Sequence, residues 1–76
     1  MAFRKGQIVE VTFKLETDPE APNEPFLRGR IEGQIAQIGW RPPDERPQDG
    51  ETWVAVVTDV FEGVPIPVVA IDHKKE

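Results

Sequence analysis

The sequence predicts one small all-β domain whose five strands close into a barrel. The eight prolines and six glycines of the 76-residue chain lie mostly between apolar runs, where they separate short strands and would interrupt helices. Apolar and polar residues alternate along the longest of these runs, as they do in a half-buried strand. A chain of this length buries only about 60% of its unfolded surface, which supports one core. Residues 1–76 are therefore expected to form a single domain.

The first strand is expected over residues 7–15. Its inward face is predicted to carry alternate apolar residues, namely Val9, Val11, Phe13 and Leu15. Residues 16–25 follow, with three prolines and four acids. Because this composition disfavours regular structure, we expect a solvated, mobile acidic loop there.

The second and third strands are expected from Phe26 onward, with a bend at Gly33. One face is predicted to carry Leu27, Gly29, Ile31, Gly33 and Ile35, and the other Arg28, Arg30, Glu32 and Gln34. A helix is an alternative, because Ile31, Ile35 and Ile38 also fit helical spacing. The glycines of this segment oppose a helix, since each weakens it by about 1 kcal/mol relative to alanine.

The fourth strand is expected over residues 52–61, after a proline-rich loop at 40–50 that ends in the turn signal Asp-Gly. It is predicted to be the most buried strand, because Trp53, Ala55 and Val57 lie on one face and Val54, Val56 and Val60 on the other.

The last strand is expected over residues 64–71, after a turn at Glu62-Gly63. Pro65 and Pro67 should leave it unpaired on one side or bulged, because proline has no backbone N–H. Residues 72–76 are read as a charged tail. Five short strands with one long connection indicate an OB-like or SH3-like barrel.

Catalysis, metal binding and small-molecule cofactors are not expected. The chain has no cysteine and no serine, which excludes the usual nucleophile and base triads as well as thiolate metal sites. The single histidine, His73, lies in a charged segment. A solvated side chain is a simpler interpretation there than a catalytic residue or a metal ligand. The carboxylates in the proline-rich loops would not be held in the fixed positions that general acid–base catalysis requires.

The charge and apolar content also bear on partners and location. No run is long enough for a membrane span or a signal peptide core, so we expect a cytoplasmic protein without a membrane partner. The net charge of −5 disfavours generic nucleic-acid binding, which usually needs a basic excess. A local basic face remains compatible with it.

Such a face is predicted if the first two strands pair, because Lys14, Arg28 and Arg30 would then point outward together. These side chains could follow a phosphate backbone. The alternative is that both arginines pair with Glu10 and Glu32 across the sheet.

Trp40 and Arg41 open the second proline-rich loop. An exposed indole there could stack on a base or insert into a protein partner, whereas a buried one would cover the end of the barrel. Trp53, surrounded by valines in its strand, is assigned to the core.

Three segments resemble the TRAM domain family: residues 5–11 (KGQIVEV), 29–33 (GRIEG) and 49–60 (DGETWVAVVTDV). The resemblance implies a small OB-like barrel that binds RNA, as the TRAM domains of tRNA-modifying enzymes do. The chain departs from the family in the long acidic segment 16–25 and in its final hairpin, where Phe61 is the one candidate stacking residue.

Two functions follow as hypotheses. The first is a non-catalytic TRAM-like barrel that binds RNA through Lys14, Arg28 and Arg30, with help from Trp40 and Arg41. The second is a protein–protein interaction module, a small regulatory or inhibitory subunit of a larger assembly, that docks through residues 40–43 and the proline-edged last strand.

Overall fold

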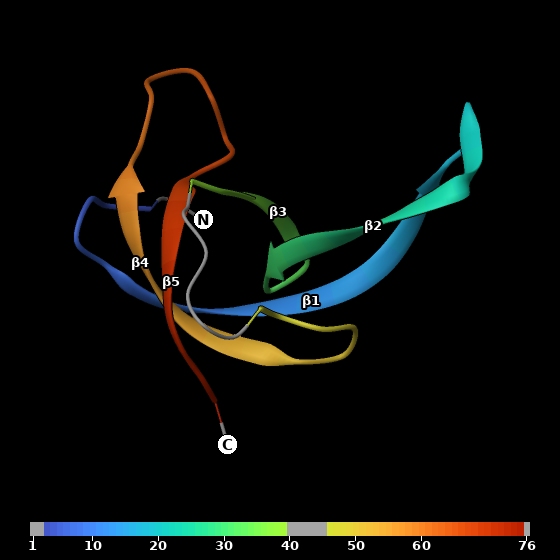
Figure 1. The fold of residues 1–76 in the computed structure, drawn as a ribbon. Coiled ribbons are helices and arrows are strands. Elements are labelled where there is room, and N and C mark those ends of the chain that lie inside the picture. Colours follow the sequence, from blue (N-terminus) through green and yellow to red (C-terminus); the bar gives the residue numbers. More distant parts are fainter. Residues whose placement is uncertain (1–2, 40–45, 76) are drawn as a thin grey trace.

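The computed structural model describes residues 3–39 and 46–75, and these form one five-stranded sheet (Figure 1). The strands are β1 (Ile8–Asp18), β2 (Ala21–Ile31), β3 (Gln34–Ile38), β4 (Thr52–Asp59) and β5 (Val68–Lys74). The described residues contain no helix, so the helical alternative for the three isoleucines is wrong. The predicted all-β fold with five strands is confirmed.

Each strand is hydrogen-bonded to two others, in the order β1-β2-β3-β5-β4 and back to β1. All pairings are antiparallel except the one between β3 and β5. The first half of β1 pairs with β4, from Ile8↔Val56 to Thr12↔Thr52. Its second half pairs with β2, beginning at Thr12↔Arg30. The strand β1 is therefore shared by two neighbours along different parts of its length.

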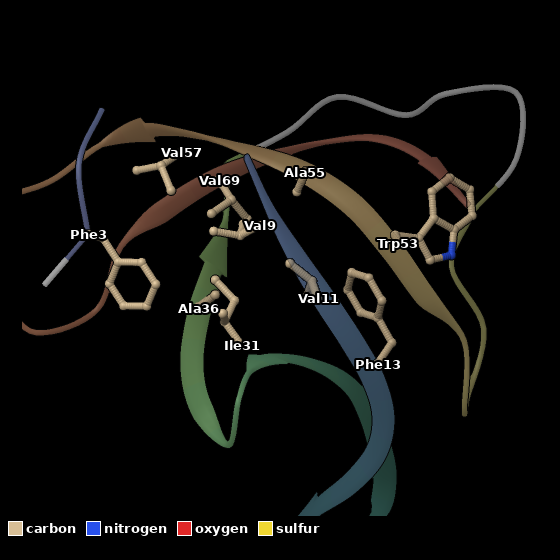
Figure 2. Close-up of a cluster of buried hydrophobic side chains, with 10 residues drawn as sticks. All are labelled: Phe3, Val9, Val11, Phe13, Ile31, Ala36, Trp53, Ala55, Val57 and Val69. Carbon is tan, nitrogen blue, oxygen red and sulfur yellow. The ribbon is translucent and has the colours of Figure 1, made fainter. Parts of the chain in front are cut away.

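The core lies on the inner face of the sheet, which is the face that carries Val9, Val11 and Phe13 (Figure 2). Ten apolar side chains are buried there: Phe3, Val9, Val11, Phe13, Ile31, Ala36, Trp53, Ala55, Val57 and Val69. The inward orientation predicted for alternate residues of the first strand is thereby confirmed, with one exception, and so is the assignment of Trp53 to the core. Leu15 is 55% exposed, because β1 has left the core at that point.

The outer side of β4 is less buried than expected. Val54 and Val56 are half-buried there, and Val60, which follows the end of the strand, is 43% exposed. Burial in this strand therefore comes mainly from its inner face.

The turn between β2 and β3 sets which face each side chain of β3 occupies. Its two central residues, Glu32 and Gly33, have φ angles of 50° and 85°, and positive φ at both is what a type I′ hairpin turn requires. The bend predicted at Gly33 is confirmed. The turn places Arg30 opposite Ile35 and Ile31 opposite Gln34. Ile35 therefore shares the outer face with the arginine and Gln34 shares the face of Ile31, so the faces predicted for Ile35 and Gln34 are both wrong. Ala36, opposite Gly29, takes the inward position.

Residues 16–25 are not a loop. β1 continues to Asp18 and β2 begins at Ala21, so this segment is the outer part of a hairpin, here called the β1–β2 arm (residues 16–26) (Figure 1). The register jumps between Glu16↔Phe26 and Asp18↔Ala21. Pro22 and Pro25 lie within this irregular stretch, where the missing proline N–H interrupts no regular ladder. The proline-rich and acidic composition of residues 16–25 is therefore compatible with strands.

The C-terminal strand is also displaced from its predicted position. β5 begins at Val68, so Pro65 and Pro67 precede it, and the carbonyl oxygen of Pro67 accepts a hydrogen bond from Gln37 N at 2.9 Å. β5 then runs to Lys74, with His73 opposite Val54, so residues 72–74 belong to the sheet and are not a tail.

The turns predicted at Asp49-Gly50 and Glu62-Gly63 are both present. Of the predicted loop 40–50, residues 40–45 lie outside the described part of the chain. Within that part, no helix is both long and apolar enough to cross a bilayer.

Candidate nucleic-acid interface

The structure brings together the three basic residues that were predicted on the first two strands. Lys14 lies directly opposite Arg28, and Arg30 lies two residues further along β2, opposite Thr12. Residues that oppose each other in a sheet point to the same side, so all three side chains share the outer face. The side chain of Lys14 is exposed and makes no hydrogen bond or ion pair with the described residues. We call Lys14, Arg28 and Arg30 the basic face.

Glu16 is the acidic partner of both arginines. Its carboxylate accepts hydrogen bonds from Arg30 Nε at 3.1 Å and from Arg30 Nη2 at 3.0 Å. Arg28 Nε lies 3.4 Å from the other oxygen of the same carboxylate. The predicted alternative placed Glu10 and Glu32 in this role, but Glu10 instead pairs with Lys75 at 2.8 Å. Glu16 takes this position because β1 extends past it on the outer face.

The cluster of Lys14, Glu16, Arg28 and Arg30 carries a net charge of about +2, because one carboxylate offsets one of three cations. The arginine and glutamate side chains are about one third exposed, so each ion pair contributes only about 0–1 kcal/mol to folding. This face is therefore cationic although the chain as a whole is acidic.

Phe26 adds an aromatic surface beside the arginines. The guanidinium carbon of Arg28 lies 4.9 Å from the centre of the Phe26 ring, within the range of a cation–π contact. Phe26 is half-buried and stands opposite Glu16. Sequence reasoning did not include it among the site residues, although Phe26, Arg28 and Arg30 alternate at strand spacing and could have been grouped on that basis.

The loop between β4 and β5 borders β3. The side-chain amide of Gln34 donates a hydrogen bond to the carbonyl oxygen of Pro65 and so ties this loop to the start of β3. Three large apolar side chains in and next to the loop are exposed: Val60, Phe61 and Val64. In the view of Figure 1 the β1–β2 arm and this loop lie on opposite sides of β3.

The carboxylate of Glu51 accepts hydrogen bonds from three neighbouring groups. A hydrogen bond from Lys74 Nζ at 2.8 Å, followed by one from the backbone N–H of Gln48, lowers the pKa of Glu51 below its usual value of 4.5. The Trp53 indole also donates to it, at 3.2 Å. This network joins the start of β4 to the end of β5, so its role is structural.

The remaining predicted site residues, Trp40 and Arg41, lie outside the described residues. Within residues 3–39 and 46–75 no group of three or more histidines and carboxylates is arranged to hold a metal ion. His73 is exposed, and its Nδ1 lies 2.6 Å from the carboxylate of the neighbouring Asp72.

Comparison with protein-family models, with curated proteins and with solved structures found no match to this chain. The resemblance to TRAM domains therefore stays a hypothesis. Function is inferred below from the geometry of the basic face.

Proposed function

We propose that this chain is a non-catalytic RNA-binding domain with an OB-like barrel fold, which binds single-stranded or structured RNA across the outer face of β1 and β2. The cyclic order of strand pairing supports the fold, because a sheet that curls into a five-stranded barrel brings its first and last strands together. OB folds bind oligonucleotides on the face of strands 2 and 3, between the loops that join strands 1 and 2 and strands 4 and 5. A domain without cysteine suits the reducing cytoplasm, where we expect it to act.

The observation that supports RNA binding most strongly is the gathering of Lys14, Arg28 and Arg30 on one outer face. Arg30 already holds a carboxylate with two nitrogens, and the same planar fork accepts a phosphate. In the proposed complex, phosphate oxygens replace Glu16 on the arginines, and Lys14 binds a neighbouring phosphate. Phe26 offers its ring to a base, with Trp40 and Arg41 as further contacts.

The test is a titration of a fluorescently labelled, mixed-sequence RNA oligonucleotide with the protein at several salt concentrations. Because about two cationic charges remain uncompensated, the logarithm of the association constant should fall against the logarithm of salt with a slope of about −1.4. Lys14→Ala should reduce the slope by about 0.7, since it removes one phosphate contact.

Lys5→Ala is the matched control, because the exposed side chain of Lys5 also makes no hydrogen bond or ion pair with the described residues but lies in the turn before β1. It removes the same charge and should leave the slope unchanged. If the two variants behave alike, binding follows the total charge and the basic face is the wrong site. If the wild-type protein does not bind RNA at low salt, the proposed function is wrong.

A second candidate function is a protein–protein interaction module that serves as a small regulatory or inhibitory subunit. The observation that favours it is the exposure of Phe61 and Val64, which are 55% and 49% exposed in the loop between β4 and β5. Exposed aromatic side chains commonly anchor protein interfaces. An association that depends on this loop should be insensitive to salt and should be lost in Phe61→Ser, whereas RNA binding through the basic face should survive that change.

A further inference from the structure

Among the described residues, one side of the first half of β1 has no neighbouring strand. Ile8 to Thr12 pair with β4 on one side, but the pairing with β2 on the other side starts only at Thr12↔Arg30. The reason is the tight turn at Glu32-Gly33, which ends β2 opposite Val11 and leads the chain away into β3. Residues 8–10 are therefore an edge within an otherwise cyclic sheet.

The hydrogen-bonding groups at this edge follow from the alternation of the backbone. Gln7 O accepts from Val57 N, and Phe13 N donates to Glu51 O, so the odd-numbered residues of β1 direct their backbone groups toward β4. The backbone N–H and C=O of Ile8 and Glu10 consequently point away from β4, toward the open side. An edge of this kind is a template for another strand.

The surface beside this edge is hollowed. An open depression of about 620 Å³ is lined by residues of β1, by the end of β2 and by β4, among them Ile8, Glu10, Ile31, Glu32 and Val54. The side chain of Ile8 is 69% exposed. Glu32 is exposed and makes no ion pair with the described residues, whereas the carboxylate of Glu10 is paired with Lys75. The depression therefore combines an apolar wall with an acidic rim in which Glu32 supplies the uncompensated charge.

The edge of β2 in the β1–β2 arm is protected against strand addition. The outer part of β2, in the β1–β2 arm, carries Pro22 and Pro25, and proline at an edge blocks the addition of a strand. Residues 8–10 contain neither proline nor lysine. The edge at β1 therefore lacks the proline and the lysine that protect many sheet edges.

We propose that the edge of residues 8–10 binds an extended peptide segment of a partner protein by strand addition. Backbone groups of the segment pair with Ile8 and Glu10, an aliphatic side chain opposite Ile8 contacts it, and a lysine or arginine opposite Glu10 lies near the carboxylate of Glu32. We expect the segment to be cationic because the rim of the depression is negatively charged. This site is separate from the basic face and does not depend on RNA binding.

The probe is a capped pentapeptide, Thr-Lys-Thr-Val-Thr, whose lysine and valine side chains share one face of an extended strand. It is titrated into the isotope-labelled protein and followed by NMR. In the free protein, the amides of Ile8 and Glu10 should exchange with solvent much faster than those of Val9 and Val11, which pair with β4. Peptide binding should shift the Ile8 and Glu10 signals and slow their exchange. A control peptide with proline in place of valine keeps the charge but lacks the backbone N–H of that residue, so it should bind more weakly.

Two variants complete the test. Ile8→Pro removes the N–H at the first residue of the strand, a position that tolerates proline, and should weaken peptide binding about fivefold, while Ile8→Val should bind like the wild type. Glu32→Lys should also weaken binding of the lysine peptide.

Three results would overturn the proposal. The first is slow exchange of the Ile8 and Glu10 amides in the free protein, which would show that the edge is already paired. The second is a concentration-dependent shift of these amides without peptide, which would identify a second copy as the occupant. The third is equal binding of the valine and proline peptides.

Discussion

Glu16→Gln tests the idea that this carboxylate competes with phosphate for the arginines. The substitution removes the negative charge and leaves a side chain of nearly the same size on the outer face. Arg28 and Arg30 lose their shared partner, so the basic face gains about one uncompensated charge. The salt slope for RNA binding should steepen from about −1.4 to about −2.1, since each neutralised phosphate contributes about −0.7.

The magnitude can be stated as a ratio of affinities. Over a tenfold decrease in salt, the ratio of the Glu16→Gln affinity to the wild-type affinity should grow about fivefold. Folding should be affected little, because partly exposed ion pairs of this kind contribute about 0–1 kcal/mol. The assay is the labelled-RNA titration at four or more salt concentrations, with a urea unfolding curve of each variant to show that both are folded.

Glu24→Gln is the matched control for this prediction. Glu24 is an exposed carboxylate of the same arm without a hydrogen bond or ion pair to the described residues. Both variants change the net charge equally, so a general electrostatic effect would shift both alike. Equal slopes for wild type, Glu16→Gln and Glu24→Gln would refute the competition between Glu16 and phosphate.

Three further predictions concern packing, pH and stacking. Gly29→Ala should destabilise the fold by about 1–3 kcal/mol in urea unfolding, because a Cβ there would lie 2.7 Å from Val11 Cγ1; an unchanged midpoint would contradict this. Glu51 has a lowered pKa, so its stabilising effect is present above pH 4.5 and is lost as the pH falls through the folded-state pKa. The difference in urea midpoint between wild type and Glu51→Gln should therefore shrink from pH 6 to pH 3, and a constant difference would exclude this cause. Phe26→Leu should weaken RNA binding by about 1–3 kcal/mol if the ring stacks on a base, without changing the salt slope.

Much of the fold could be predicted from the sequence because alternation fixes which side chains share a face. Val9, Val11 and Phe13 are inward for that reason, and the same alternation placed Lys14 and Arg28 together on the outer face. The grouping of the basic residues needed only the pairing of two adjacent strands.

The errors arose where composition was used in place of pairing. Prolines and acids suggested a loop at 16–25, but an irregular hairpin accommodates both, and Glu16 was consequently not considered as a partner of the arginines. Similarly, His73 and Lys74 looked like a tail, although their backbone groups pair with β4 whatever their side chains carry. Ile35 was misplaced because the length of the turn, which sets the register after Gly33, could not be read from the alternation alone.

The parallel pairing of β3 with β5 is the shortest in the sheet, with only two residue pairs, Gln37↔Val68 and Ile38↔Val69. Parting these two strands separates fewer paired residues than parting any other neighbours, so local opening should begin there. The cycle then becomes an open sheet in the order β3-β2-β1-β4-β5, with β1 as its middle strand and hinge. The basic face belongs to one half of that sheet and Phe61 to the other. A ligand that touches both halves would therefore hold the molecule closed, whereas a ligand confined to one half would leave the hinge free to move.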